Sequence, residues 1–326
     1  MLLVVVLVHC RGALSRQQHD AWLRLQSRAR TARDGAEIPA KWSSEAREAF
    51  ASEGFVVREG VVSEARCEAL RESLEALFAG EFDTGIFPDE WHWRAGLSKE
   101  HCVREMVNAW KSSDYVARIA LDPEIAKLAC DLMGWGGVRL AQDDVVWKPS
   151  GAGGVGFHRD STYVSDNFEP RDHNSVTVWI ALEPADAENG GVEYAVGSHK
   201  WPRDDDDFAA AGGAKTFFFG SEESRRRGAC RPVGTGGAIF HHQDILHGSG
   251  PNTSTRPRRA LVLHYIRDDL RLRAKADYIY GRYVLGDRAV HDAFFPLVYS
   301  RDPTAPTPTA TRRLCSTCRP LKFQIS

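Results

Sequence analysis

Apolar residues in the first third of the chain follow a helical period that is interrupted by one short extended run. The segment from Ser43 begins with residues that suit a helix N-cap and continues in helix formers until Gly54. Residues 55–62 then predict a strand. Between Ser63 and Gly80, apolar side chains recur at helical spacing, which predicts a helix whose apolar face packs on a sheet. Two further helices are predicted, at residues 113–121 and 122–133.

From residue 138 onward the pattern changes to short extended runs separated by Gly, Pro, Asn and Asp, which is typical of a β-sandwich or barrel. Asn189-Gly190 is the strongest hairpin signal in the chain. We therefore predict a β core at residues 137–268, preceded by a mostly helical part at residues 41–136. The predicted strands of the core are residues 138–148, 174–182, 237–241 and 258–266.

A chain of 326 residues with 43% hydrophobic residues can bury one large core. We therefore expect a single domain at residues 41–300, between a leader (residues 1–40) and a flexible, Pro/Thr-rich tail (residues 301–326). The apolar run at residues 2–8 is far too short to span a membrane, so the leader is expected to be flexible or a weak targeting segment. The expected location is intracellular, in the cytoplasm, with targeting or secretion left open.

The formal net charge of -2 gives no electrostatic reason to expect nucleic acid or an anionic membrane as the main partner. We expect a small-molecule substrate and a monomer or weak homo-oligomer. The seven cysteines are scattered and odd in number, which fits reduced thiols better than a disulfide framework. Cys315 and Cys318 form a CxxC in the tail, interpreted as two thiols and not as a zinc or redox site, because no second pair accompanies them.

His158 and Asp160 stand one residue apart at the end of an extended apolar run. On a strand, such side chains leave by the same face, so this imidazole and carboxylate could bind one metal ion such as Fe(II), which needs a third ligand. The downstream candidates are His241, His242, His247 and His264. His247 is favoured because it stands where a strand gives way to turn formers, whereas His241 and His242 are interpreted as structural.

His158, Asp160 and His247 would form a 2-His-1-carboxylate triad, which leaves coordination positions free on Fe(II) for a chelating cosubstrate and for dioxygen. A 2-oxoacid such as 2-oxoglutarate has a second carboxylate, which a planar guanidinium satisfies with two parallel hydrogen bonds. Arg258, eleven residues after His247 on the next predicted strand, fits this role.

Several linked motifs in this part of the chain resemble those of the phytanoyl-CoA dioxygenase (PhyH) family of Fe(II)/2-oxoglutarate oxygenases. The matching pieces are residues 142–149, 158–160, 176–182, 188–194, 197–199, 247–252 and Arg258. The resemblance implies a mainly β fold with flanking α-helices around a double-stranded β-helix core, of the jelly-roll, cupin-like kind.

The same resemblance implies roles for individual residues. Iron would be held by His158, Asp160 and His247, and 2-oxoglutarate would be anchored by Arg258. The resemblance also implies three residues near the cosubstrate, namely Lys148, Trp179 and Ser249. It places either Gln142 or Trp147 at the rim of the cosubstrate.

The expected function is that of an Fe(II)/2-oxoglutarate-dependent dioxygenase, which uses O2 to hydroxylate a C–H bond of a small molecule and releases succinate and CO2. The alternatives are an acyl-CoA 2-hydroxylase, like the family's namesake, and a non-catalytic metal-binding β-helix module. We expect the substrate to lie between the Trp91/Trp93 region and the loop at residues 161–174. Arg225–Arg227 could meet the phosphates of an acyl-CoA, but is interpreted as a solvated turn.

Overall fold

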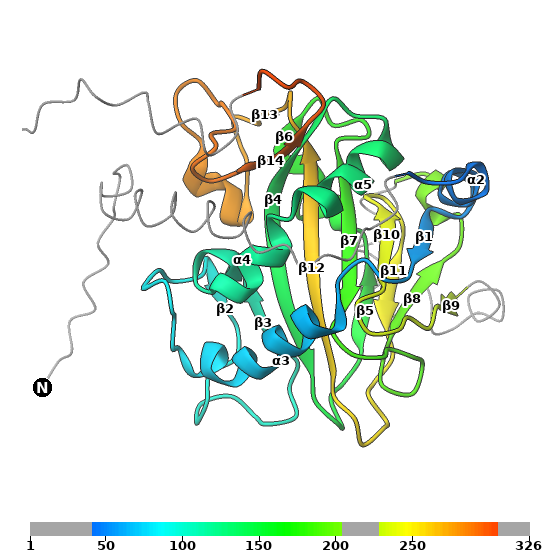
Figure 1. The fold of residues 1–326 in the computed structure, drawn as a ribbon, viewed down its shortest axis with the longest axis vertical. Coiled ribbons are helices and arrows are strands. Elements are labelled where there is room, and N and C mark those ends of the chain that lie inside the picture. Colours follow the sequence, from blue (N-terminus) through cyan, green and yellow to red (C-terminus); the bar gives the residue numbers. More distant parts are fainter. Residues whose placement is uncertain (1–40, 204–227, 306–326) are drawn as a thin grey trace, which may run out of the picture.

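The computed structural model of the protein describes residues 41–203 and 228–305. Helices occupy much of the first part of the chain, and antiparallel strands dominate after residue 137 (Figure 1). The α-helices are α2 (Ser44–Glu53), α3 (Glu64–Ala79), α4 (Asp114–Ala120) and α5 (Pro123–Met133). Short 3-10 helices are η1 (Ala109–Lys111), η2 (Asp160–Thr162), η3 (Ser165–Asn167), η4 (Ser198–Lys200) and η5 (Tyr278–Tyr283).

Local signals set the bounds of these helices. The side chain of Ser43 accepts a hydrogen bond from the backbone N–H of Ala46, and that of Asp122 accepts one from Glu124, so each satisfies an N–H group that the helix leaves unpaired. Helices α2, α3 and α5 each end at a glycine with a positive φ, a conformation that side chains with a Cβ rarely adopt. These glycines are Gly54, Gly80 and Gly134.

Two antiparallel sheets form the centre of the molecule. The larger has eight strands, in the order β1-β10-β7-β12-β4-β3-β2, with β14 also paired to β4. Its strands are β1 (Phe55–Arg58), β2 (Glu90–Trp91), β3 (Arg104–Val107), β4 (Gly137–Lys148), β7 (Ser175–Ala181), β10 (Ala238–His242), β12 (Arg258–Arg267) and β14 (Leu297–Ser300). The smaller sheet has the order β5-β11-β8-β9, from β5 (Val155–His158), β8 (Val192–Ala195), β9 (Gly228–Cys230) and β11 (His247–Ser249). A third pair joins β6 (Phe168–Glu169) and β13 (Arg271–Leu272).

The two faces of the larger sheet have different neighbours, as the alternation along β7 shows. Val176, Val178 and Ile180 are fully buried in the core that the helices build. Helices α3, α4 and α5 cross in front of this face in Figure 1. Thr177 and Trp179 leave β7 on the other side, toward the smaller sheet. The polar side chains of the large sheet therefore meet in the space between the two sheets.

The mainly β fold with flanking helices and a jelly-roll core, predicted from the sequence, is confirmed. Two strands were not predicted, because the part expected to be mostly helical also supplies β2 and β3 to the edge of the large sheet. Within residues 41–203 and 228–305, no helix is long and apolar enough to cross a membrane.

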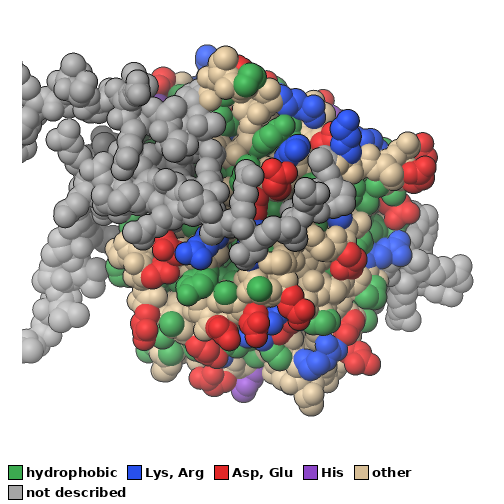
Figure 2. Space-filling view, viewed as in Figure 1, with side chains coloured by type: hydrophobic (Ala, Val, Ile, Leu, Met, Phe, Trp, Pro, Cys, Tyr) green, Lys and Arg blue, Asp and Glu red, His purple; other side chains and the backbone are tan. Residues whose placement is uncertain are grey.

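Outside the grey residues, acidic and basic side chains are interspersed on the face shown in Figure 2, in keeping with the net charge of -2. Arg225–Arg227 and Cys315–Cys318 lie outside the described residues.

Because α3 packs its apolar side on the sheet, Leu74→Ala is expected to lower the free energy of unfolding by about 2–5 kcal/mol, through lost burial and a residual cavity. Leu97→Ala is the matched control, since Leu97 is 84% exposed and its loss should change little. Urea denaturation of both variants measures the difference. Equal effects would show that α3 is not part of the core.

Candidate metal and cosubstrate site

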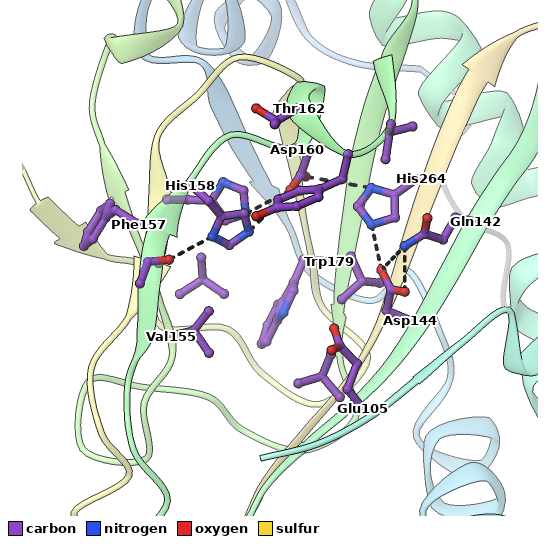
Figure 3. A pocket seen from close by; sticks show the side chains of 18 of the residues that line it. Glu105, Gln142, Asp144, Val155, Phe157, His158, Asp160, Thr162, Trp179 and His264 are labelled. Carbon is purple, nitrogen blue, oxygen red and sulfur yellow. Dashed lines mark hydrogen bonds and ion pairs between the residues drawn. The ribbon is translucent and has the colours of Figure 1, made fainter. Parts of the chain in front are cut away.

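A cavity of about 1200 Å³ lies between the two sheets. Its walls come from both of them: β5 and β11 of the smaller sheet, and β4, β7, β10 and β12 of the larger. The loop predicted to cover the substrate also contributes, through Thr162, Tyr163, Val164, Asp166 and Asn167. Figure 3 shows His158 and Asp160 with Trp179, His264 and Asp144 around this space.

His158, Asp160 and His247 come together at one end of the cavity. His158 ends β5, His247 begins β11, and the two residues are directly paired across the smaller sheet. The Nε2 atoms of His158 and His247 lie 3.6 and 3.4 Å from Oδ1 of Asp160. One potential ligand atom from each residue lies within 4.8 Å of the other two, a spacing suited to a single metal ion.

The prediction that His158 and Asp160 share a strand face is wrong in its geometry, although both reach the same site. Strand β5 ends at His158, and Asp160 begins the 3-10 helix η2. The turn of the chain after the strand, and not the alternation within it, brings the carboxylate beside the imidazole.

The hydrogen bonds of the two imidazoles leave the facing nitrogen free for a metal. Nδ1 of His158 lies 2.9 Å from the carbonyl oxygen of Gly156, and Nδ1 of His247 lies 3.2 Å from that of Ile245. A carbonyl oxygen only accepts, so each Nδ1 carries a proton, and in the neutral ring Nε2 keeps its lone pair for a metal. Burial, followed by repulsion from His158 and His241, outweighs the attraction of Asp160 and holds the pKa of His247 well below its usual value, so its ring is neutral.

The second oxygen of Asp160 is fully occupied by protein donors. Oδ2 accepts hydrogen bonds from Oγ1 of Thr177, at 2.6 Å, and from Nε2 of His241, at 2.8 Å. Burial alone would raise the pKa of Asp160, but the hydrogen bond from His241 and the nearby charge of His264 hold it well below its usual value. Asp160 is therefore an ionised carboxylate with Oδ1 facing the two histidines and Oδ2 fixed.

These donors belong to a longer buried network whose proton positions can be assigned. Tyr194 donates to Nδ1 of His241, which leaves Nε2–H of His241 for Asp160. Since Thr177 donates to Asp160, its oxygen accepts from Nδ1–H of His264, at 3.0 Å, while Nε2–H of His264 donates to Asp144, at 2.8 Å. His264 is thus an imidazolium, in agreement with a pKa that the hydrogen bond to Asp144 raises against the effect of burial.

The register of the large sheet explains why these side chains meet. Thr177 is paired with His241 on one side and with His264 on the other, and His264 is paired with Gln142. The four residues form one row across β10, β7, β12 and β4 on the cavity face. Gln142 closes the network by donating to both oxygens of Asp144 and accepting from Tyr280.

Two buried cations lie further along the same strands. Arg258 and Lys148 are directly paired across β12 and β4, and they are 2% and 0% exposed. Nζ of Lys148 donates to Oγ of Ser249 at 2.7 Å and to the carbonyl of Gly250 at 2.6 Å. Arg258 donates through Nε to the carbonyl of Gly190 and lies over the ring of Trp179, 5.5 Å from its centroid.

Neither Lys148 nor Arg258 forms an ion pair with a carboxylate among residues 41–203 and 228–305. Burial lowers the pKa of Arg258 to about 10. Burial and then repulsion from Arg258 lower the pKa of Lys148 to about 7. Arg258 and Ser249 line the cavity, so an anion that entered it would offset two charges that the protein alone leaves unbalanced.

Of the remaining residues predicted near the cosubstrate or substrate, some line the cavity and others do not. Trp179 and Gln142 line the cavity, whereas Trp147 packs on the helix side of the sheet, against Phe78. Trp91 and Trp93 do not border the cavity, since the indole of Trp93 packs edge-on against Phe78 and donates to Lys99. These residues were predicted as a substrate wall, and their neighbour His92 is the one at the cavity.

Sequence reasoning separated the downstream histidines only in part. His242 packs beside Phe50 and hydrogen-bonds away from the metal site, as a structural histidine would. His241 lines the cavity and contacts Asp160, although it was also interpreted as structural. Thr177 and His264 gave no motif signal as supports of the site, because a row across four strands cannot be recognised until the strand order is known.

The fold and the site define a jelly-roll protein that carries, within the described residues, one candidate metal centre and a separate pair of buried cations. Residues 50–260 match the model of the phytanoyl-CoA dioxygenase (PhyH) family, and the chain belongs to this family. Family membership confirms the predicted enzyme class, a non-haem iron dioxygenase that uses 2-oxoglutarate and O2.

Known relatives are distant in sequence. Phytanoyl-CoA dioxygenase domain-containing protein 1 from Danio rerio is 23% identical over 268 residues, covering 68% of this chain and 88% of the relative. The non-heme alpha-ketoglutarate-dependent carbocyclase SnoK from nogalamycin biosynthesis superposes with a TM-score of 0.61 at 23% identity, covering 81% of this chain and 99% of SnoK. EctD from S. alaskensis, solved with 2-oxoglutarate and 5-hydroxyectoine, gives 0.56 at 22% identity, over 73% and 82%. At these identities the two structures establish a shared fold.

If His247 is a ligand, His247→Ala should abolish iron retention without unfolding the chain, because the residue lies at a strand end. His242→Ala is the control, since His242 is a buried histidine outside the triad. Iron content after purification, together with a thermal melt, measures both effects. Loss of iron in His241→Ala or His264→Ala, with iron kept in His247→Ala, would show that the ligand assignment is wrong.

Thr177→Val keeps the shape of the side chain and removes the donor to Oδ2 of Asp160. The metal affinity should fall by about 10–100-fold, as when other supports of a ligating carboxylate are removed. Thr162→Val is the matched control, because Thr162 borders the cavity without contacting Asp160. Competition with a chelator measures both affinities, and an unchanged affinity in Thr177→Val would refute a positioning role.

Proposed function

We propose that this protein hydroxylates a C–H bond of a small-molecule substrate, with Fe(II) held by His158, Asp160 and His247. The observation that carries the proposal is the meeting, in one cavity, of this triad with a buried pair of cations that lack an anion. A metal site without the cations would fit many hydrolases, and the cations without the metal would fit any anion-binding protein.

The donor set suits Fe(II). Two neutral imidazoles and one carboxylate match a borderline divalent metal and leave further coordination positions for other ligands. The protein presents Oδ1 of Asp160 and the two Nε2 atoms on the cavity side, while the other polar atoms of these side chains are already engaged. This arrangement needs no rearrangement of the side chains before a metal binds.

The cationic pair suits 2-oxoglutarate. One carboxylate and the keto oxygen would bind the metal, and the second carboxylate would be bound by the guanidinium of Arg258. Lys148 lies behind Arg258, adds positive charge to this end of the cavity and fixes Ser249 through a hydrogen bond. Trp179 supplies an apolar surface between the metal end and the cationic end.

When bound together, Fe(II), 2-oxoglutarate and O2 supply the oxidising power for C–H hydroxylation, and 2-oxoglutarate leaves as succinate and CO2. The contribution of the chain is to hold Asp160 in one orientation, to balance the charge of the cosubstrate and to direct the substrate. The loop at residues 161–174 is kept in place over the cavity by ion pairs of Arg171 with Asp166 and Asp244. Its side chains can therefore exclude water from the reacting atoms.

The proposal is tested by measuring succinate formed by purified protein with Fe(II), 2-oxoglutarate, ascorbate and a panel of acyl-CoAs, amines, amino acids and other metabolites. A true substrate should raise succinate formation and gain one oxygen atom from labelled O2, and Asp160→Ala should do neither. Turnover of an acyl-CoA would favour the namesake activity. Iron and 2-oxoglutarate binding without turnover of any compound would favour a non-catalytic module, and absence of iron binding would refute the proposal.

Arg258→Gln should weaken 2-oxoglutarate binding by about 100-fold, because a charge-assisted bidentate contact is worth roughly 1.5–3 kcal/mol and more when buried. Arg256→Gln is the control, since Arg256 lies on the surface in an ion pair with Asp186. Calorimetric titration with 2-oxoglutarate in the absence of oxygen measures both. If the two variants bind the cosubstrate equally well, Arg258 is not the anchor.

A further inference from the structure

The cavity over the large sheet has room for two molecules side by side: the cosubstrate near Arg258, and a substrate over the neighbouring strands. Arg258 lies on β12, and the row that supports Asp160 is centred on β7 and β12, with its ends on β10 and β4. The cavity extends sideways from there over β4 and β3, which are the next two strands. Two strand spacings correspond to about 10 Å, which is room for a small molecule beside a bound dicarboxylate.

The wall over β3 and β4 carries a carboxylate without a partner. Glu105 on β3 is paired with Val146 on β4, so both face the cavity, and Figure 3 shows Glu105 beside Asp144 and Trp179. Both oxygens of Asp144 accept hydrogen bonds from Gln142, and one also from His264. The carboxylate of Glu105 has neither a hydrogen bond nor an ion pair within the described parts of the chain.

A second unpartnered polar group faces the same space. Trp179 is only 5% exposed and lines the cavity, yet its indole N–H has no hydrogen-bond acceptor among the described residues. Buried indole N–H groups usually have an acceptor, so this group is available to a ligand. The cavity thus offers a ligand both an acceptor, Glu105, and a donor, Trp179, separated by apolar side chains.

The other charged groups around this wall form no ion pair with Glu105 within the described parts of the chain, although the imidazolium of His264 attracts it. Lys275 and His92 border the cavity but are exposed, so water screens them. Asp166 is paired with Arg171 and Arg203. Burial and the neighbouring Asp144 raise the pKa of Glu105 to about 7, and a cation placed beside it would favour the ionised form.

We propose, on the basis of the function proposed above, that the substrate carries a protonated amine bound by Glu105, on an apolar body that lies over Val146 and Val262. Tyr278 lies close enough for Asp144 and Glu105 to raise the pKa of its hydroxyl group, after the effect of burial. Tyr278 lines the same cavity, and an aromatic ring can bind a cation over its face. The anion of the cosubstrate and the cation of the substrate then occupy opposite ends of one cavity, which prevents each from binding in the place of the other.

The test uses three compounds of one shape: cyclohexylmethylamine, cyclohexylmethanol and cyclohexanecarboxylate. Calorimetric titration into protein loaded with Fe(II) and 2-oxoglutarate, without oxygen, should show the amine binding at least about tenfold more tightly than the alcohol, and the carboxylate binding least. Glu105→Gln should remove the advantage of the amine, and Glu105→Lys should shift the preference to the carboxylate. Glu81→Gln is the control, because Glu81 is exposed and outside the cavity.

The inference is overturned if the amine binds no more tightly than the alcohol, if no compound binds, or if the advantage of the amine survives in Glu105→Gln. Affinities for Fe(II) and 2-oxoglutarate are measured separately in each variant, and their retention shows that the fold is intact. Failure of the wild type to bind either one refutes the proposed function. Retention of both, without a preference for the amine, refutes only the amine. The titrations are repeated on metal-free protein, because Glu105 does not contact the triad.

Discussion

The structure depends on keeping the carboxylate of Asp160 ionised at a site that is almost closed to water. A buried charge without partners costs several kcal/mol, so its surroundings must supply hydrogen bonds and positive charge. Thr177 and His241 supply the hydrogen bonds, and they reach Asp160 only because β10 and β7 pair in one register. A slip of one residue would turn both side chains toward the helices and leave the carboxylate without donors. The candidate metal site therefore requires the register of the whole sheet, and that register is fixed by the apolar face under α3, α4 and α5.

Charge is distributed along the cavity in a consistent way. Moving along β4, the cavity face carries Gln142, Asp144, Val146 and Lys148, so four residues separate the acidic from the cationic side chain, or about 13 Å. The imidazolium of His264 balances Asp144 at one end, whereas Lys148 and Arg258 at the other end form no ion pair within the described parts of the chain. This asymmetry gives a dicarboxylate one preferred orientation, with its outer carboxylate away from Asp144.

The sequence predicts best what depends on near neighbours in the chain. Helix ends follow from Ser43, Asp122 and the glycines that end α2, α3 and α5, because each cap involves residues a few positions apart. The triad and Arg258 can be found because His158 and Asp160 are only two positions apart in sequence and the other two stand at strand ends. Thr177 and Glu105 could not be found. Thr177 acts through strands 60 to 90 residues away in sequence, and Glu105 lies on a four-residue strand, next to the edge of the sheet, in a part of the chain dominated by helix formers.

Polar groups around the cavity are of two kinds: those with hydrogen-bond partners in the protein, which hold side chains in place, and those without partners, which are available to a ligand. Where a side chain must stay in one position, as with Oδ2 of Asp160 and both nitrogens of His241, every donor and acceptor has a protein partner. Where a ligand is expected, the partners are missing, as at the carboxylate of Glu105 and the indole of Trp179. A polar group without a partner costs about 1–3 kcal/mol when it is fully buried, and less when it is half-buried, as Glu105 is. The carboxylate of Glu105 and the indole of Trp179 face one cavity, so a ligand that fills this cavity can complete both groups, and the chemistry of each missing partner indicates what that ligand carries.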